Sequence, residues 1–568
     1  MILHVIKTKI NLIIKDSAKA ILYFLEEQME DKIIVSNTHI CITNYTMGDC
    51  EQLENIFRTF DPVTHKFNSF GMYYDKDNKK LYIPAGIDLW RIKRMFEQKY
   101  YKREIHHKYQ TIDNILIKAK PRDDEQRQAL RFMCGVNEYS DNYELAQLSV
   151  NLNTGKGKTY CSIASICFFR IKSVIITGST TLLNQWAQEI MRYTNLTMKD
   201  ILFMNGSSVC NMALQGKSRK AKEAKIFLIT HGTLRSFAET YGWDKINLLF
   251  EELGIGLKFF DEAHTNFANM LMIDFFTNVF KTFYVTATPG RSNWRENNIF
   301  QISLKNVPSI DLFDENNDPH TSYVAIKWNS RPTPQQISAC RNMYGLDRMK
   351  YIDYITKQPS FYDMLRIIMD LVIKCKGKVL MYIGTNDGIL RVYHWIGTNY
   401  PEFLGDIGVF TSLLDKSAKL KEKETKKLLL TTTKSAGLGE HIPGLKMTIV
   451  LAEPFKSEII ARQTLGRTRD PKTMYVELVD LGFKYTRKFY NDKLRVFNKY
   501  AKDVSDTHID QYELERRSKI LEEERMKYQE CPFVLDDKRF DFDKVLPKKK
   551  DQINQNEPMC PVFFVPKK

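Results

Sequence analysis

Short apolar runs alternate with amphipathic stretches over most of the chain, a pattern that predicts β-strands separated by α-helices. In the first half, helical patterns fall at 160–169 and 182–190, and the apolar runs occupy residues 148–150, 173–176, 226–230, 257–260 and 283–285. In the second half, the apolar runs occupy residues 379–384, 409–410, 428–431, 447–451 and 474–478. Strands that alternate with helices pair in parallel, so we expect two α/β domains with ligands at the carboxyl ends of the strands.

Four parts follow from this pattern and from shifts in composition. They are an N-terminal α+β accessory domain (1–118), a first α/β domain (119–312), a second α/β domain (313–487), and a helical extension with a flexible basic tail (488–568). Within the first part, residues 70–84 read as two strands joined by a polar turn, which predicts a β-hairpin. Residues 291–320 are polar and turn-rich, and we place the linker between the α/β domains there. The charged helical pattern of the extension runs from Lys488 to Glu530, and the tail begins beyond Lys538.

Composition narrows the class of protein. The ten cysteines form no CxxC pair, so buried free thiols are favoured over zinc ligands, which indicates a reducing compartment. No apolar run approaches the roughly 18 residues that a membrane span needs, which predicts a cytoplasmic chain that contacts no membrane. The net charge of +16 and the pI near 9.1 favour nucleic acid as partner, although a lysine-rich proteome would give the same excess. The abundance of lysine and asparagine would suit a phage or a large DNA virus, and the host cytoplasm would then be the location.

A glycine-bearing turn between a predicted strand and a predicted helix carries the strongest local signal. Residues 152–159 read Leu-Asn-Thr-Gly-Lys-Gly-Lys-Thr, and such a turn points backbone N–H groups and a helix dipole into one anion-binding concavity. Lys158 can reach the β and γ oxygens of a nucleotide, and the Thr159 hydroxyl is the expected magnesium ligand. The alternative is a surface turn, which would need no acidic site downstream. The residues expected to hold the phosphates are Thr154, Gly155, Lys156, Gly157, Lys158 and Thr159.

An acidic pair follows the apolar run at 257–260. A carboxylate at the tip of a buried strand can hold magnesium, and its neighbour can orient and deprotonate an attacking water. We assign Asp261 to the metal and Glu262 to the base. The next strand ends in hydroxyl residues that can relay the state of the γ-phosphate. The residues expected to couple hydrolysis to movement are His264, Thr286 and Thr288.

Two kinds of segment are candidates for nucleic-acid contact. Thr177 and Thr230 end predicted strands, where hydroxyls and loop amides can hold a phosphodiester backbone without reading its sequence. Between residues 91 and 120, cations are interleaved with tyrosines, so charges can neutralise phosphates while rings stack on bases. An amphipathic helix with a basic solvated face is the alternative for this stretch. The cations singled out are Arg94, Lys102 and Arg103.

The second α/β domain has no phosphate loop of its own, but it offers a glycine-relaxed loop and a helix that carries arginines. An arginine that faces the nucleotide held by the first domain can raise the rate by about 10³ to 10⁵. We expect Gly437 and Gly439 to line the nucleotide. We expect Arg467 and Arg469 to act on its phosphates. Hydrolysis then becomes a mechanical event, because nucleotide binding draws the domains together and product release lets them part.

Taken together, these motifs resemble those of superfamily 2 helicases of the DEAH type over residues 120–490. The matching segments are Gln126, residues 154–159, Asp261-Glu262-Ala263-His264, Thr286-Ala287-Thr288-Pro289 and Gln463-Thr464-Leu465-Gly466-Arg467. The resemblance implies two RecA-like domains, ATP with Mg²⁺, and translocation along nucleic acid. It also implies that Gln126 contacts adenine and that Gln463 and Arg467 contact the γ-phosphate. Residues 183–190 resemble the branch of transcription-factor repair helicases, phage recombination helicases and the poxvirus transcript-release helicase.

Two positions depart from the DEAH pattern. Asp470 takes the place of the usual second arginine of motif VI, with Arg469 one residue earlier. Residues 433–439 also resemble motif V of Swi2/Snf2 double-stranded DNA translocases.

The sequence therefore predicts an ATP-dependent helicase that unwinds or remodels DNA in replication, recombination or repair. The alternatives are a double-stranded DNA translocase that displaces proteins or transcripts without unwinding, and the motor subunit of a restriction-type nuclease. We expect a monomer that binds nucleic acid, DNA in the first place with RNA left open. A protein partner would bind the N-terminal domain or the tail.

Overall fold

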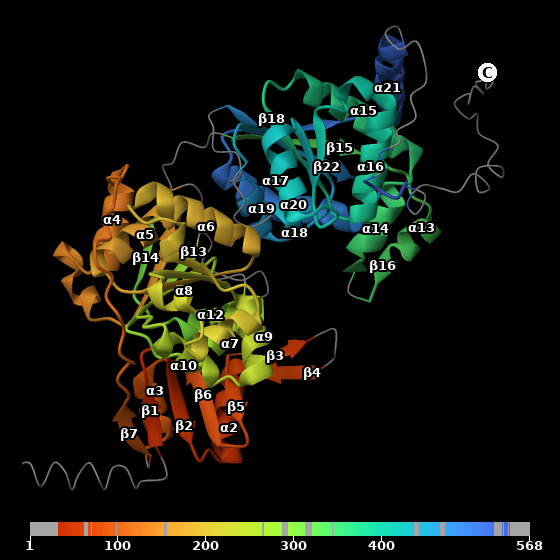
Figure 1. Cartoon of the computed structure of the whole chain (residues 1–568). Coiled ribbons are helices and arrows are strands. Elements are labelled where there is room, and N and C mark those ends of the chain that lie inside the picture. Colours follow the sequence, from red (N-terminus) through yellow and green to blue (C-terminus); the bar gives the residue numbers. More distant parts are fainter. Residues whose placement is uncertain are drawn as a thin grey trace, which may run out of the picture. The chain divides into compact units, whose positions relative to one another are not determined.

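The computed structural model separates the chain into two compact units, Met1–Glu315 and Asn316–Lys568 (Figure 1). Each unit is built on one large parallel sheet, and the first unit also carries a smaller N-terminal sheet. The residues that the structure describes are 32–61, 66–69, 71–97, 99–152, 156–263, 266–286, 294–312, 321–343, 345–436, 442–465, 472–526, 537, 539–542 and 545.

Seven parallel strands form the large sheet of the first unit. In chain order they are β8 (Gln147–Leu152), β9 (Ser173–Thr177), β10 (Ile201–Phe203), β11 (Ile226–Thr230), β12 (Leu257–Asp261), β13 (Lys281–Thr286) and β14 (Ser309–Leu312). Their order across the sheet is β10-β11-β9-β12-β13-β8-β14. Every residue of β8, β9, β11, β12 and β13 is buried, as expected for a parallel sheet covered on both faces.

Helices cover both faces of this sheet. They are α4 (Asp124–Cys134), α5 (Lys158–Phe169), α6 (Thr180–Tyr193), α7 (Ser207–Leu214), α8 (Arg219–Glu223), α9 (His231–Tyr241), α10 (Lys245–Glu252), α11 (Phe267–Phe275) and α12 (Trp294–Ser303), with 3₁₀ turns at Asn137–Tyr143 and Met198–Asp200. Phe259 on one face of β12 shares a core with residues of α4, α5 and α6. Its neighbour Phe260, on the opposite face, shares a core with residues of α9, α10 and α11.

A five-stranded sheet precedes these elements in the order β5-β6-β2-β1-β7. Its elements are β1 (Lys32–Val35), β2 (His39–Thr43), β5 (Tyr73–Asp75), β6 (Lys80–Pro84) and β7 (Tyr100–Arg103), with helices α2 (Met47–Phe57) and α3 (Leu89–Met95) and a separate hairpin of β3 (Arg58–Asp61) and β4 (Lys66–Ser69). The β5–β6 pair, in register Tyr73↔Tyr82, confirms the predicted hairpin. Ile42 and Leu81 of this sheet belong to the same continuous core as Phe260. The N-terminal sheet is thus packed onto the first large sheet.

The second unit repeats the plan. Its strands are β15 (Thr321–Trp328), β18 (Lys378–Ile383), β19 (Ile407–Phe410), β20 (Leu428–Thr431), β21 (Leu445–Ala452), β22 (Thr473–Asp480) and β23 (Val504–His508), and a small hairpin pairs β16 (Arg341–Asn342) with β17 (Gly345–Leu346). Its helices are α13 (Pro334–Ala339), α14 (Arg348–Ile355), α15 (Pro359–Lys374), α16 (Asn386–Asn399), α17 (Lys416–Thr425), α18 (Thr433–Ala436), α19 (Glu458–Leu465), α20 (Lys484–Tyr500) and α21 (Gln511–Met526), with a 3₁₀ turn at Pro401–Phe403.

The two large sheets have the same topology. The second sheet has the order β19-β20-β18-β21-β22-β15-β23. If the seven strands of each sheet are numbered along the chain, both sheets read 3-4-2-5-6-1-7. This confirms the predicted fold class of two tandem RecA-like parallel-sheet domains with an N-terminal α+β part. The exact domain boundaries stay a prediction.

Two expectations from the sequence are corrected here. Within residues 294–312, predicted to lie in a linker, 294–303 form α12 and 309–312 form β14, which extends the first sheet by pairing with β8. The long helix predicted from Lys488 to Glu530 is interrupted, because β23 pairs in parallel with β15 between α20 and α21. Hydrogen bonding along an open sheet edge outweighs the helical pattern of the sequence there.

Part of the tail predicted to be flexible is packed on the second unit. The Arg539 guanidinium donates to the Glu422 carboxylate at 2.7 Å. The buried ring of Phe540 lies edge-on to Tyr393 of α16, with ring centroids 5.4 Å apart. The carbonyl of Val545 accepts a hydrogen bond from the Arg391 guanidinium at 2.8 Å. Arg539, Phe540 and Val545 therefore pack on the second unit.

Cysteine burial agrees with the sequence analysis. Of the eight cysteines that the structure describes, seven are buried free thiols, and Cys375 is half-buried. Among the described residues, there is no group of three or more His, Cys, Asp or Glu side chains that could hold a metal ion. Among the same residues, no helix combines the length and apolarity that crossing a bilayer requires.

Candidate active site

The turn after β8 leads into α5 at the carboxyl edge of the first sheet. Gly157, directly before the helix, has a φ of +91°, a conformation that favours glycine. A Cβ at this position would lie 2.2 Å from Nε2 of Gln126, so the close packing also requires glycine. The N-cap residue of α5 is Gly157, which has no side chain to cap the helix, so the first N–H groups and the dipole of α5 can face an anion.

Lys158, the first residue of α5, meets Glu262 across this edge. Its Nζ lies 3.3 Å from Oε1 of Glu262, and the two side chains are 12% and 14% exposed. The sheet explains the meeting, because β13 pairs with both β8 and β12 and all three strands end at the same edge. An incoming phosphate would compete with Glu262 for the ammonium group and leave the carboxylate able to accept a proton.

Asp261, the last residue of β12, is buried beside this pair. Its Oδ2 accepts a hydrogen bond from Nε1 of Trp186 in α6 at 2.9 Å. Burial, followed by the negative charge of Glu262, raises the pKa of Asp261 to about 6, although the Trp186 hydrogen bond and the Lys158 charge act in the opposite direction. The carboxylate is therefore ionised, and able to bind a metal, at pH values above about 6.

The backbone of Glu262 is strained. Its φ of +52° lies in the left-handed region, which costs a non-glycine residue roughly 1–2 kcal/mol. Strained backbone of this kind gathers at functional sites, where the surrounding structure holds it in place. Here the turn follows β12 directly and accompanies the pairing of the Glu262 carboxylate with Lys158.

Two side chains of α4 brace the phosphate loop. The Lys156 ammonium pairs with Oε1 of Glu125 at 2.9 Å. Gln126, which is 4% exposed, donates from Nε2 to the carbonyl of Lys156 at 3.1 Å and accepts the Arg122 N–H at 2.9 Å. Both ends of the Gln126 amide thus bond the backbone, and one N–H and one oxygen lone pair remain for a contact with adenine.

The chemistry of this edge fits a triphosphate with magnesium. The Lys158 ammonium and the amides of the first turn of α5 suit phosphate oxygens. The buried Asp261 carboxylate is a hard oxygen ligand of the kind that Mg²⁺ prefers, and the Thr159 side chain follows Lys158 in the same turn. Three of these features come from the first turn of α5, and Asp261 comes from the end of β12, about a hundred residues later.

The two strand-end threonines have structural roles. Thr177 is fully buried, and its hydroxyl donates to the carbonyl of Ser179 at 2.9 Å. Thr230 is 8% exposed, and its hydroxyl caps α9 by accepting the Thr233 N–H at 3.1 Å. Their exposed neighbours Gly178 and Gly232 are better placed for a phosphodiester. Nucleic-acid contact at Thr177 and Thr230 stays a prediction.

Thr286 ends β13 and is buried, at the same edge of the sheet as Asp261. The other members of the predicted site lie outside the described residues, so their roles stay predictions. They are Thr154, Gly155, His264, Thr288, Gly437, Gly439, Arg467, Arg469 and the side chain of Gln463, whose backbone belongs to α19.

The predicted N-terminal cations lie on α3 and β7. The exposed Arg94 guanidinium lies 5.6 Å from the ring centroid of Trp90, whose side chain is 68% exposed. Arg103 is also exposed, and Lys102 beside it is half-buried. One guanidinium nitrogen of Arg103 donates to Oδ1 of Asn37 at 3.2 Å.

Sequence reasoning missed Trp186 and Glu125 as parts of the site. Trp186 lies in a helical pattern that reads as ordinary core, and its partner Asp261 is 75 residues away. Glu125 lies next to Gln126 in a polar segment whose pattern indicates a solvent-exposed helix. Its pairing with Lys156 could not be predicted, because it requires α4 to pack beside the phosphate loop.

Replacing Trp186 with phenylalanine should move the pH dependence of ATP hydrolysis. The indole N–H stabilises the charged form of Asp261, so its loss raises the pKa of that carboxyl further. We expect the acidic limb of kcat/KM, near pH 6 in the wild type, to shift upward by about one pH unit, since hydrogen bonds to charged groups contribute about 1.5 kcal/mol or more. A Trp243→Phe control should leave the limb in place. A limb that does not move in Trp186→Phe would contradict this assignment.

Comparison with known proteins found a matching family model and a related protein. Residues 91–291 match the family model described as Type III restriction enzyme, res subunit. The protein named Putative DNA 3'-5' helicase Rad25, from Haloarcula marismortui, is 25% identical over 189 residues, which cover 33% of this chain and 27% of that protein. This chain therefore spans about a quarter of the length of that relative. The two matches support the class that the motifs indicated, a superfamily 2 helicase or translocase.

Two solved structures are similar over a larger share of the chain. The crystal structure of T4 UvsW is 13% identical and covers 84% of this chain and 100% of that chain, with a TM-score of 0.31. S. cerevisiae Dbp5 bound to RNA and ADP BeF3 is 14% identical and covers 70% of this chain and 92% of that chain, with a TM-score of 0.45.

Proposed function

We propose that this chain is an ATP-dependent helicase that couples ATP hydrolysis to movement along DNA and to its unwinding or remodelling, in replication, recombination or repair. The pairing of Lys158 with Glu262 beside the buried Asp261 carries this proposal. The family match over residues 91–291 and the repeated sheet topology support it. A phage or viral source, and the DEAH-type branch named above, are further parts of the proposal.

The residues of the edge divide the chemistry among them. Lys158 and the first amides of α5 bind the β- and γ-phosphates and orient them. Asp261 and Thr159 would hold Mg²⁺, which when bound neutralises phosphate charge. Once a phosphate replaces Glu262 as the partner of the Lys158 ammonium, Glu262 accepts a proton from the attacking water. We propose Arg467 and Gln463 as the γ-phosphate contacts of the second domain.

Nucleic acid would be gripped in part by the N-terminal sheet. Arg94, Lys102 and Arg103 on α3 and β7 supply positive charge, and the exposed ring of Trp90 offers a surface for base stacking. The name of the Haloarcula relative, a DNA 3'-5' helicase, favours DNA as the substrate.

Two other motors are the alternatives. The likeness of residues 433–439 to Swi2/Snf2 motif V favours a double-stranded DNA translocase that does not unwind. The description of the matched family favours the motor subunit of a restriction-type nuclease. Both would use the same ATP site as the helicase, so the nucleic-acid substrate that stimulates hydrolysis distinguishes between the three functions.

Steady-state ATP hydrolysis should be measured without nucleic acid and with single-stranded DNA, duplex DNA, forked DNA and RNA. The helicase proposal predicts strong stimulation by forked or single-stranded DNA, accompanied by ATP-dependent strand separation. Stimulation by plain duplex with triplex displacement and no strand separation would favour the translocase. If RNA alone stimulates hydrolysis, the DNA assignment is wrong. If no nucleic acid raises the rate, the motor assignment fails.

A further inference from the structure

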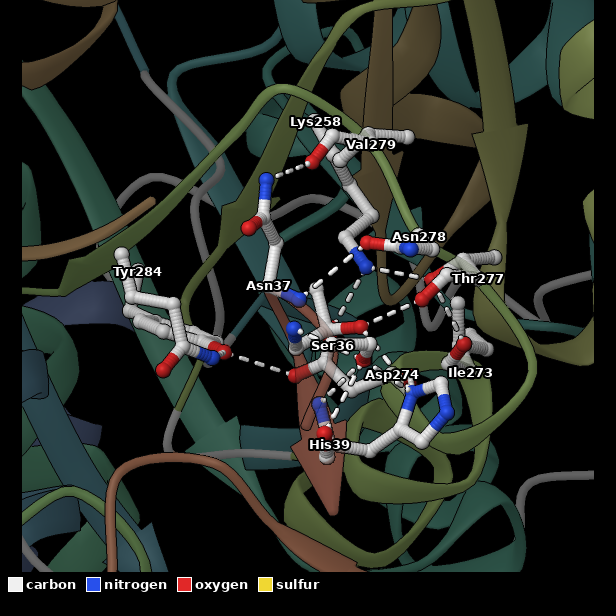
Figure 2. A network of polar contacts seen from close by, with 12 residues as sticks. Ser36, Asn37, His39, Lys258, Ile273, Asp274, Thr277, Asn278, Val279 and Tyr284 are labelled. Atoms are coloured by element: carbon white, nitrogen blue, oxygen red, sulfur yellow. Dashed lines mark hydrogen bonds and ion pairs between the residues drawn. The ribbon is translucent and has the colours of Figure 1, made fainter. Parts of the chain in front are cut away.

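A buried polar network joins three strands of the first sheet to α11 (Figure 2). The fully buried ammonium of Lys258, on β12, lies 2.5 Å from Oδ1 of Asp274 and 2.6 Å from the Thr277 hydroxyl. The other oxygen of Asp274 accepts the hydroxyl of Tyr284, on β13, at 2.7 Å. That hydroxyl in turn accepts from Nε2 of Gln147, at the start of β8, at 2.6 Å. The network therefore ties together the strands that end at the phosphate loop, the acidic pair and Thr286.

The turn between β1 and β2 of the N-terminal sheet completes this network. Nδ1 of His39 lies 3.0 Å from the carbonyl of Asp274, which accepts a hydrogen bond from the tautomer that carries its proton on Nδ1. Burial lowers the pKa of His39 to about 4, so the ring is neutral at neutral pH. The hydroxyl of Thr38 donates to the carbonyl of Thr277. Two carbonyls at the end of α11 are thus held from the N-terminal sheet.

Asn37, in the same turn, holds the chain that leads into β13. Its backbone N–H donates to Oδ1 of Asn278 at 3.1 Å. Its side-chain amide donates to the carbonyls of Val279 and Phe280 at 2.9 and 3.2 Å. The turn at 36–39 therefore clamps the whole connection at 274–280, between α11 and β13 (Figure 2).

An exposed cation reaches this clamp. Arg103 is the last residue of β7. Its guanidinium donates a hydrogen bond to Oδ1 of the Asn37 side chain at 3.2 Å, and this contact is exposed to solvent. An exposed hydrogen bond of this kind contributes little stability, whereas a guanidinium binds phosphate by charge-assisted, bidentate bonds. A nucleic-acid phosphate can therefore replace Asn37 as the partner of Arg103, with little loss of stability.

We propose that Arg103 and Asn37 form a relay through which nucleic acid bound at the N-terminal sheet sets the position of β12 and β13, and with them Asp261 and Thr286. When phosphate engages Arg103, the Asn37 amide loses one partner and its hold on the 274–280 connection changes. The Lys258 network carries that change to the strands of the ATP site. Asn37 acts as a positioning residue in this relay, far from the reacting atoms. The inference rests on the proposed function, because it assigns the regulation of the same ATP site.

Asn37→Ala separates the relay from binding. We expect ATP hydrolysis without nucleic acid and the affinity for DNA to stay within about twofold of wild type, while the stimulation of hydrolysis by DNA falls roughly 2- to 30-fold. Asn195→Ala is the matched control, because the Asn195 amide also bridges backbone groups of the first unit, donating to Asn114 at 2.7 Å. It should leave the stimulation unchanged. Should Asn37→Ala fold poorly, the near-isosteric Thr38→Val removes one donor of the same turn and should lower the stimulation in the same direction.

A double-mutant cycle tests the link to the exposed cation. Arg103→Ala should weaken DNA binding and lower the stimulation, and adding Asn37→Ala to it should lower the stimulation no further. Arg94→Ala serves as the comparison, since its guanidinium stacks on Trp90 and makes no bond to Asn37 among the contacts of the described residues. In the Arg94→Ala background, Asn37→Ala should keep its full effect. Equal effects in both backgrounds, or an unchanged stimulation in a folded Asn37→Ala protein, would overturn the relay.

Amide hydrogen exchange distinguishes a failed relay from a failed motor. Adding a DNA oligonucleotide to the wild-type protein should change protection at residues 274–280, and this change should be absent in Asn37→Ala. A wild-type protein whose hydrolysis is stimulated by DNA without any response at 274–280 would refute the relay and leave the motor intact. A response at 274–280 without stimulated hydrolysis would support the relay and refute the motor assignment.

Discussion

Replacing Lys158 with alanine is expected to lower kcat/KM for ATP hydrolysis by about 10³-fold, the upper range for removing one preorganised charge from a reacting phosphate or oxyanion. The ammonium lies 3.3 Å from the Glu262 carboxylate, and it lies in the first turn of a helix whose amides can face the same anion. Its loss also leaves Glu262 without this ion pair. The measurement is steady-state hydrolysis with saturating DNA and Mg²⁺, with thermal unfolding as a check on folding.

Lys156→Ala is the neighbouring control. The Lys156 ammonium is held by Glu125, so its loss should cost far less than tenfold. Glu262→Gln should bind ATP about as tightly as the wild type while hydrolysis falls by about 10² to 10⁴, because the amide cannot accept the proton. A Lys158→Ala protein that keeps more than a tenth of its activity would place the ATP site elsewhere.

Asp274→Ala is expected to destabilise the first unit by about 3–5 kcal/mol in the free energy of unfolding, because it leaves the Lys258 charge buried without its partner. The two side chains are 0% and 2% exposed, so solvent offers no screening. Burial lowers the pKa of Lys258, and the Asp274 carboxylate opposes that shift in the wild type. Urea or thermal denaturation of the first-unit transition measures the loss.

The sign of the pH dependence follows from the same charges. Without Asp274, the pKa of Lys258 in the folded state falls further below its unfolded value, so the unfolded state binds more protons. The stability of Asp274→Ala should therefore rise as the pH increases from 7 toward the unfolded pKa of lysine, more steeply than in wild type. The exposed Arg219–Glu223 pair gives the control, since Glu223→Ala removes only a solvent-screened ion pair and should leave the stability nearly unchanged. A loss in Asp274→Ala no larger than in Glu223→Ala would contradict the role of the buried pair.

The sequence was most informative where burial is complete. Strands such as β9, β11 and β12 are continuous apolar runs because both of their faces are covered, and their positions were predicted directly. Since parallel strands end at one edge, the meeting of Lys158 with Asp261 and Glu262 also followed from the pattern. By contrast, β23 is exposed along its whole length and has no apolar pattern, so its pairing with β15 could not be predicted from the sequence.

The buried polar groups could not be predicted, because their partners are distant in the sequence. Lys258 interrupts an apolar run and would ordinarily be read as solvent-facing, yet it is satisfied by Asp274 of α11 and by Thr277 just beyond that helix. His39 meets Asp274 across 235 residues. Gln126 was expected at adenine from family resemblance, and its bonds to the loop backbone depend on how α4 packs.

Movement along nucleic acid driven by hydrolysis at the Lys158–Glu262 site is the central claim, and displacement of streptavidin from biotinylated DNA tests it most directly. Strands carrying biotin at either end, single-stranded or duplex, should be tested with ATP, with a non-hydrolysable analogue, and with the Glu262→Gln protein. We predict that the wild type clears streptavidin from one end with ATP alone, and that Glu262→Gln binds the same DNA and clears none. Hydrolysis of ATP stimulated by DNA, without displacement from either end of any strand, would contradict the account.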